Sequence, residues 1–169
     1  MGTSHPECRP WSIQKILDCK AKYVLDIGAG SGTYADALRN SGYRGKIDAV
    51  EIWQPYIDEY NLTNKYRNVY SNDVRLFDNF DYDVVIFGDI LEHMTKEQAL
   101  KVWKKVSAQS QYALIAIPII HYHQGEINGN PYETHVKEDW SVDEVLDSFS
   151  NIVDHIAGDI VGAFWADFR

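Results

Sequence analysis

The 169-residue sequence has few cysteines and no long apolar run. Its two cysteines, Cys8 and Cys19, are too few for a disulfide framework and lack the spacing of a metal-binding motif, which favours a reducing, cytoplasmic setting. No stretch approaches the roughly 18 consecutive apolar residues that cross a bilayer. The first residues also lack the apolar core of a signal peptide. We therefore expect a cytoplasmic protein with no membrane partner.

Basic residues are also scarce: 16 Lys and Arg stand against 25 Asp and Glu, a net charge of −9. An acidic surface repels phosphate backbones, whose neutralisation supplies most nucleic-acid affinity. The densest lysine cluster, Lys101, Lys104 and Lys105, is too small to reverse this, so no long nucleic acid is expected as a partner. The apolar fraction of 45% is typical of a globular chain. The length fits one domain over residues 1–169.

Strand and helix patterns alternate along the chain. Short apolar runs predict five strands, at residues 23–28, 46–53, 68–74, 82–90 and 112–120. Amphipathic spacing predicts four helices, at residues 31–42, 54–66, 95–110 and 141–149. Two of these helices begin with capping-box patterns, Thr95 to Gln98 and Ser141 to Glu144. The alternation predicts an α/β fold with a parallel sheet and helices on both of its faces.

A glycine-rich turn follows the first strand, in the stretch VLDIGAGSGTYADAL at residues 24–38. Gly28, Gly30 and Gly32 have a G-x-G-x-G spacing, whereas dinucleotide sites have G-x-G-x-x-G and triphosphate loops have G-x-x-x-x-G-K-[ST]. Asp26 precedes the turn, and its carboxylate would repel a pyrophosphate but would suit an ammonium group. The turn therefore favours a cationic or zwitterionic ligand.

Glu51 ends the second predicted strand, 23 residues after the first glycine of the turn. This is close to the offset of about 20 residues at which a carboxylate accepts hydrogen bonds from ribose hydroxyls. A ligand with a ribose and an ammonium group, and without a demanding phosphate site, describes S-adenosylmethionine.

From about Tyr23 onward the sequence resembles the class I (Rossmann-like) S-adenosylmethionine-dependent methyltransferases. The likeness is carried by VLDIGAGSG, VEIW, NDV and YDVVIFGDILEHM, in that order. It implies a doubly wound, mostly parallel seven-stranded sheet with an antiparallel last strand. The last two strands would lie near Ile152–Ile160 and Val161–Phe168. It also implies S-adenosylmethionine as cofactor and S-adenosylhomocysteine as product.

The same resemblance implies roles for single residues. Glu51 would bind the ribose hydroxyls, and Asp89 would lie beside both the methionine moiety and the acceptor. The residues expected at the methionine part are Asp26, Gly28, Ala29, Gly30 and Gly32. The residues expected at the adenine are Ile52, Trp53, Asp73 and Val74.

Residues 121–140 have little helix or strand signal. A loop of this length in a small domain is usually functional or disordered, and we expect this one to be a substrate lid over the carboxyl edge of the sheet. Its GNPYETH…W pattern, and SHPECRPW near the N-terminus, resemble a group of bacterial methyltransferases of unassigned substrate. Residues 1–20 would form a second flap or helix, the alternative being that Trp11 packs beneath the sheet.

DILEH, at residues 89–93, places Asp89, Glu92 and His93 on one face of a helical turn. With His135 downstream, the pattern resembles the small-RNA 2′-O-methyltransferases, in which E-x-x-E-H and a later histidine hold a divalent ion, and the ubiquinone-pathway O-methyltransferases. Asp89 departs from the first glutamate of that pattern. We expect these four side chains to face the substrate without a metal.

We expect methyl transfer from S-adenosylmethionine to an oxygen or nitrogen of a small-molecule acceptor. The acceptor must lose a proton, and histidine is the side chain best suited to receive one near neutral pH. The catalytic candidates are His93 first, with His121, His123 and His135 behind it, and Asp89. The alternatives are a non-catalytic S-adenosylmethionine-binding protein or a lyase on the same fold, and an NAD-dependent oxidoreductase.

Overall fold

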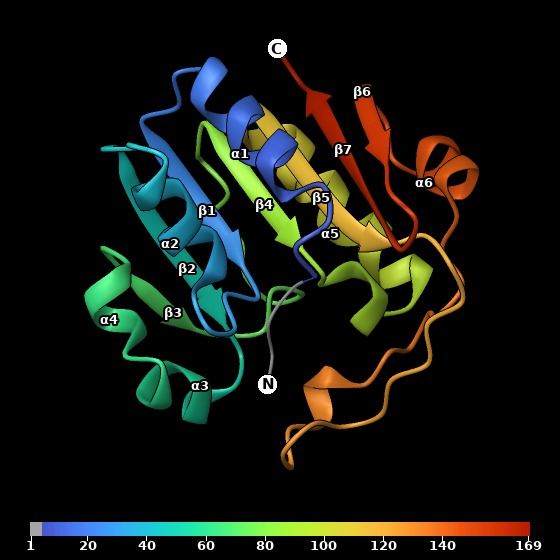
Figure 1. Cartoon of the computed structure of the whole chain (residues 1–169), viewed down its shortest axis with the longest axis horizontal. Coiled ribbons are helices and arrows are strands. Elements are labelled where there is room, and N and C mark those ends of the chain that lie inside the picture. The colour runs from blue at the N-terminus through green and yellow to red at the C-terminus, as the bar shows by residue number, and fades with distance from the viewer. Residues whose placement is uncertain (1–4) are drawn as a thin grey trace.

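The computed structural model describes residues 5–169 and has a seven-stranded sheet at its centre (Figure 1). The strand order is β3-β2-β1-β4-β5-β7-β6. β7 pairs antiparallel with both of its neighbours, β5 and β6, and all the other pairs are parallel. The strands are β1 Tyr23–Ile27, β2 Lys46–Glu51, β3 Val69–Ser71, β4 Val84–Gly88, β5 Tyr112–Pro118, β6 Ile152–Ala157 and β7 Val161–Asp167. The predicted mostly parallel sheet with one antiparallel strand is therefore confirmed.

Helices cover both faces of the sheet, as Figure 1 shows. They are α1 Arg9–Asp18, α2 Thr33–Asn40, α3 Gln54–Glu59, α4 Leu62–Lys65, α5 Lys96–Gln109 and α6 Val142–Ser148. One apolar cluster packs α5 and α6 against the sheet, and a second packs α1 to α4 against the other face. Because both faces are covered, the central strands are buried along almost their whole length, rather than alternating between buried and exposed residues.

The longest helix, α5, forms as its sequence predicts. The hydroxyl of Thr95 accepts from the Gln98 N–H at 3.2 Å, and the Gln98 side chain accepts from the Thr95 N–H at 3.0 Å. This reciprocal capping box satisfies two backbone donors at the start of the helix. The apolar stripe of the helix is buried on the sheet.

Two predicted elements differ from the structure. The helix expected over residues 54–66 is divided into α3 and α4, because Asn61 between them has a φ of +52° and a left-handed residue cannot continue an α-helix. The turn expected at DILEH is a 3₁₀ helix, Leu91–His93 (η1), and it begins only after Asp89, whose φ is +51°. Asp89 is therefore not on a common helical face with Glu92.

The N-terminal segment combines the two readings that the sequence left open. Helix α1 buries Ile13 and Ile16 against the sheet, with Trp11 packed beside them. Ahead of the helix, the Glu7 carboxylate accepts from the N–H groups of residues 159–161 at 2.9, 2.7 and 2.6 Å, at the start of β7. Residues 1–4 of the expected flap lie outside the described residues. Within residues 5–169, no helix is long and apolar enough to cross a bilayer.

Candidate active site

A cavity of about 200 Å³ lies at the carboxyl edge of the sheet. Its walls come from the turn after β1, the end of β2, the segment after β4 and the loop 121–140, which runs below the sheet in Figure 1. In an open α/β sheet ligands bind at this edge, where the strand order reverses. The reversal lies between β1 and β4, so the cavity is at the expected place.

The glycine turn forms one wall. Gly28 has a φ of +68°, and a Cβ there would lie 2.6 Å from Cδ1 of Ile90. A side chain would therefore strain the backbone and displace its neighbour. Gly28, Ala29 and Gly30 line the cavity. Gly32 instead begins α2 with a φ of +81° and is not among the lining residues.

The carboxylate of Glu51 connects this turn to the second strand. It is only 5% exposed and accepts from the N–H of Gly30 at 2.9 Å and from that of Trp53 at 2.8 Å. Burial raises the pKa of Glu51, and the two backbone N–H donors oppose that rise. A carboxylate fixed in this way presents its remaining lone pairs to hydroxyl donors in the cavity.

Asp26 lies deeper in the cavity wall and is 2% exposed. The hydroxyl of Tyr66 donates to its carboxylate at 2.5 Å. Burial raises the pKa of Asp26 to about 7, although the Tyr66 bond opposes the rise. Near physiological pH the Asp26 carboxyl can therefore be neutral, or can be ionised beside a cationic ligand.

A smaller cavity lies next to the first and shares Gly28, Ile52 and Ile90 with it. Asp73 and Val74 line it. Hydrogen bonds from Arg75 outweigh burial and hold the pKa of Asp73 below its usual range. The ring of Trp53 lies against Tyr132, with centroids 6.0 Å apart, and is not among the residues that line either cavity.

The charges in the main cavity indicate which ligand the cavity can hold. Among residues 5–169, no lysine or arginine lines it. They include five carboxyl groups: Asp26, Glu51, Asp89, Glu92 and Glu133. Such a site disfavours a pyrophosphate and fits a ligand with cationic groups and ribose hydroxyls. The residues present therefore fit S-adenosylmethionine.

Asp89 follows β4 and lies where the N-terminal segment meets the cavity. One carboxylate oxygen accepts from the His5 N–H at 3.1 Å, and the other is buried without a hydrogen-bond partner in the described chain. Burial raises its pKa to about 7. His5 itself lines the cavity. The N-terminal segment thus forms part of the site.

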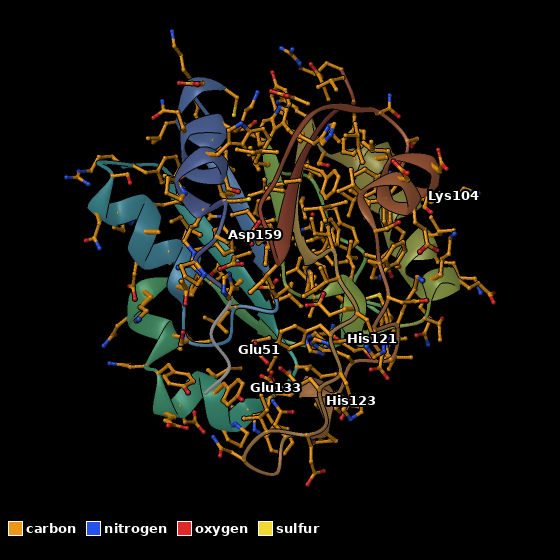
Figure 2. The ribbon with its side chains drawn as sticks, turned by 45° about the vertical axis from the view of Figure 1, so that its right-hand side comes forward. Glu51, Lys104, His121, His123, Glu133 and Asp159 are labelled. Carbon is orange, nitrogen blue, oxygen red and sulfur yellow. The ribbon has the colours of Figure 1, made fainter. Side chains whose placement is uncertain are left out.

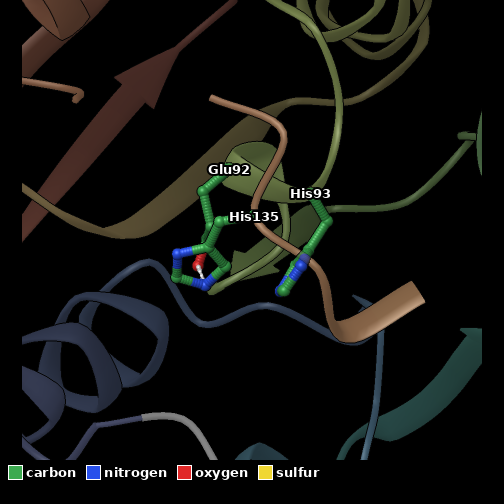
Figure 3. A group of neighbouring side chains, drawn as sticks. All are labelled: Glu92, His93 and His135. Carbon is green, nitrogen blue, oxygen red and sulfur yellow. Dashed lines mark ion pairs between the residues drawn. The ribbon is translucent and has the colours of Figure 1, made fainter. Parts of the chain in front are cut away.

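Glu92, His93 and His135 come together where the loop 121–140 meets the cavity, as Figure 3 shows. His135 Nε2 lies 4.0 Å from Glu92 Oε1, and the two imidazole rings are 4.9 Å apart between centroids. Burial lowers the pKa of His93 to about 4 and lowers that of His135, so both rings are neutral near pH 7. Burial also raises the pKa of Glu92 well above its usual range.

The other two histidine candidates lie elsewhere. The side chains of His121 and His123 are 73% and 77% exposed, and both face Glu138, at 3.6 and 2.9 Å. Neither lines the main cavity. Figure 2 labels both on the loop 121–140. The structure therefore brings His93, His135 and Asp89 to the cavity and does not bring His121 there.

Several site residues carry no sequence motif. Tyr66 holds Asp26 from 40 positions away. The ring of Tyr34 lies against the end of β4, where a Cβ on Gly88 would be 2.4 Å from it. Glu7 reaches Asp159, which Figure 2 labels, across 152 positions. The only signal for such partners was a tyrosine or an acid close to a predicted element end, which is too common to be informative.

Comparisons with known proteins fit this geometry. A family model described as "Methyltransferase domain" matches residues 25–115. The chain belongs to this methyltransferase family. Its fold and its family identify it as a class I, S-adenosylmethionine-dependent methyltransferase. No curated protein matches the chain.

Solved structures show the same fold at low identity. An S-adenosylmethionine-dependent methyltransferase from Clostridium acetobutylicum is 12% identical, with a TM-score of 0.70 over 98% of this chain and 92% of that one. A Burkholderia thailandensis 1,6-didemethyltoxoflavin-N1-methyltransferase, crystallised with bound 1,6-didemethyltoxoflavin and S-adenosylhomocysteine, is 17% identical, with a TM-score of 0.68 over 94% of this chain and 76% of that one. A Nostoc punctiforme protein is 14% identical, with a TM-score of 0.67 over 92% of this chain, which spans about half (54%) of its length.

Proposed function

We propose that this methyltransferase transfers the methyl group of S-adenosylmethionine to an oxygen or nitrogen of a small molecule held in the main cavity. The observation that carries the proposal is the continuity of that cavity. The glycine turn and Glu51 line one part of it, and His93 and His135 line another. A cofactor and a small acceptor would therefore meet inside a single space, which supports transfer rather than binding alone.

In the cofactor part, we assign the methionine moiety to the turn at Gly28 to Gly30, with Asp26 behind it. Glu51 would accept hydrogen bonds from the ribose hydroxyls. Ile52, Asp73 and Val74 would surround the adenine in the smaller cavity. When bound, S-adenosylmethionine supplies an electrophilic methyl group on a positively charged sulfur. The chain's own task is then to align the acceptor, and alignment can supply most of the acceleration.

In the acceptor part, the proton that the nucleophile loses would pass to Nε2 of His93 or His135. Nδ1 of His93 lies 3.1 Å from the carbonyl of Thr134, and Nδ1 of His135 lies 2.7 Å from that of Tyr122. Because a carbonyl only accepts, Nδ1 carries the ring proton and Nε2 has a free lone pair in each neutral ring. Asp89 would lie beside both substrates.

The small size of the acceptor is inferred from the site. The cavity is partly covered by residues 121–140 and by the N-terminal segment, which leaves little room for a macromolecule. The net charge of −9 also disfavours a nucleic acid. The Burkholderia neighbour shows that the fold accommodates a small heterocyclic acceptor in that protein. We also propose a cytoplasmic location, on the small number of cysteines.

A product screen tests the proposal. The protein is incubated with methyl-deuterated S-adenosylmethionine and fractionated pools of small metabolites, and mass spectrometry records any product that carries the label. We expect labelled product, with S-adenosylhomocysteine released only when the acceptor pool is present. A cofactor that binds but is never consumed, across oxygen and nitrogen acceptors alike, would support the binding-protein alternative. Cofactor cleavage without an acceptor would support the lyase.

A further inference from the structure

The group formed by Glu92, His93 and His135 has a geometry that the methyl transfer does not require. One ligand atom from each of the three side chains lies within 4.8 Å of the others. Figure 3 shows Glu92 and His93 of η1 together with His135 of the loop 121–140. Carboxylate oxygen and imidazole nitrogen together are the donor set of divalent transition metals.

Backbone contacts hold the three side chains in this arrangement. The carbonyl of Glu92 accepts from the N–H groups of Val136 and Lys137 at 2.8 and 3.0 Å. The carbonyl of Thr134 accepts from His93 Nδ1 at 3.1 Å. Residues 134–137 of the loop 121–140 are therefore fixed against η1, and His135 is held beside Glu92.

The orientation of both imidazoles is that of metal ligands. Each Nδ1 is engaged by a backbone carbonyl, of Thr134 for His93 and of Tyr122 for His135. Metal-binding histidines almost always donate their second ring N–H in this way, which fixes the tautomer and leaves the other nitrogen free to bind the ion. Here Nε2 of His135 lies 4.0 Å from Glu92 Oε1, and one ring nitrogen of His93 lies within 4.8 Å of the ligand atoms of Glu92 and His135.

Glu92 supplies the second, independent observation. It is 2% exposed, and neither of its carboxyl oxygens has a hydrogen-bond partner among residues 5–169. Its nearest ionisable partner, His135 Nε2, is 4.0 Å away, beyond hydrogen-bond distance. An unpartnered buried carboxylate is costly unless it is paired or binds a cation. No lysine or arginine lines the cavity within the described residues to provide that charge.

We propose that Glu92, His93 and His135 bind one divalent transition-metal ion of the Mn²⁺, Fe²⁺, Co²⁺ or Zn²⁺ class. Asp89, which the sequence grouped with these residues, is outside the set, because neither of its carboxylate oxygens belongs to the group of atoms that lie within 4.8 Å of one another. Two histidines and one carboxylate leave coordination positions open, as in catalytic rather than structural sites. With only one carboxylate, the site does not suit Ca²⁺, which takes six to eight oxygen ligands.

Glu92, His93 and His135 all line the main cavity, so an acceptor oxygen or nitrogen held there would complete the coordination and lose its proton more readily. His93 and His135 would then act as ligands rather than as bases. This consequence rests on the proposed methyl transfer, whereas binding of the ion does not.

The test uses the full chain after dialysis against a chelator. Co²⁺ and Zn²⁺ are titrated by calorimetry, and the visible absorption of bound Co²⁺ reports nitrogen and oxygen coordination. We expect one ion per chain, with affinity reduced at least about tenfold in Glu92→Gln and in His135→Asn, since loss of a second-shell partner alone costs about 10–100-fold. His123→Asn, on the same loop but exposed, is the matched control and should bind as the wild type does.

Absence of one-to-one binding by the wild-type chain would overturn the proposal, as would equal affinity in the wild type, Glu92→Gln and His135→Asn. The Co²⁺ spectrum of the wild-type chain tests the proposal even where a variant fails to fold. Binding of S-adenosylmethionine is measured on the same samples without metal. Loss of metal binding alone therefore refutes this inference and leaves the proposed methyl transfer standing.

Discussion

Replacement of Glu51 by alanine is the perturbation that the structure defines best. The wild-type carboxylate is buried and accepts from two backbone N–H groups, those of Gly30 and Trp53. In Glu51→Ala both donors lose their protein partner. Each unsatisfied buried donor costs about 1–3 kcal/mol, and water entering the cavity recovers part of this. We expect the free energy of unfolding to fall by about 2–4 kcal/mol.

The same change would remove the proposed acceptor for the ribose hydroxyls. The loss of affinity for S-adenosylmethionine should be about 1–3 kcal/mol, which is a rise in Kd of about 5- to 150-fold. Burial raises the pKa of Glu51, and only the ionised form accepts from hydroxyl donors on both oxygens. Wild-type affinity should therefore fall as the pH is lowered through that raised pKa, and Glu51→Ala should show a flatter profile.

Calorimetry measures the affinity, and urea denaturation measures the stability. Glu59→Ala is the matched control, because it removes the same charge from an exposed position on the neighbouring helix α3. Its affinity and stability should match those of the wild type. Wild-type affinity in Glu51→Ala at every pH would refute the assignment of Glu51 to the ribose.

Three further predictions concern the turn and the buried acids. Gly28→Ala should lower stability by about 1–2 kcal/mol through its positive φ, and should lower cofactor affinity at least about tenfold. The control Gly42→Ala, with a φ of +89° and open space around its Cβ, should lower stability alone. Equal cofactor affinity in the two variants would argue against a close approach of the turn to the cofactor. Asp26 has a pKa of about 7 against 3.8 for the free group, so its contribution to stability is lost as the pH rises between these two values. Asp26→Asn should flatten this decline of stability with pH in denaturation curves taken from about pH 4 to about pH 8. An unchanged slope would contradict the raised pKa of Asp26. At Asp48, hydrogen bonds from Arg67 and Tyr82 outweigh burial and lower the pKa. The contribution of Asp48 to stability is therefore present above the pKa of the free group, and is lost as the pH falls through the lowered pKa of the folded state. Asp48→Asn should cost about 2 kcal/mol of stability at neutral pH without changing cofactor affinity.

The meeting of the glycine turn and Glu51, the proposed cofactor half of the site, was predictable because its signals are local. The glycine turn follows a strand directly, and Glu51 ends the next one, so the topology of a parallel sheet brings them to the same edge. The hydrogen bond from the Gly30 N–H to Glu51 is the physical link between the two motifs.

The proposed acceptor half depends on contacts between distant segments. His121 and His135 lie on the same loop, and the sequence offered both as candidate bases, although only His135 belonged to the pattern with Glu92 and His93. Only the path of the loop, fixed by hydrogen bonds from Val136 and Lys137 to Glu92, carries His135 into the cavity and leaves His121 outside. The break at Asn61 was missed for a related reason, because a single left-handed residue interrupts an otherwise helical pattern.

The other assignments depend on the binding of S-adenosylmethionine in the cavity by the glycine turn and Glu51. Calorimetric titration of the wild-type chain with S-adenosylmethionine, and in parallel with NAD, measures this binding. We expect saturable binding of one S-adenosylmethionine per chain, weakened in Glu51→Ala, and no binding of NAD. Binding of NAD in place of S-adenosylmethionine, or no binding of S-adenosylmethionine, would contradict it.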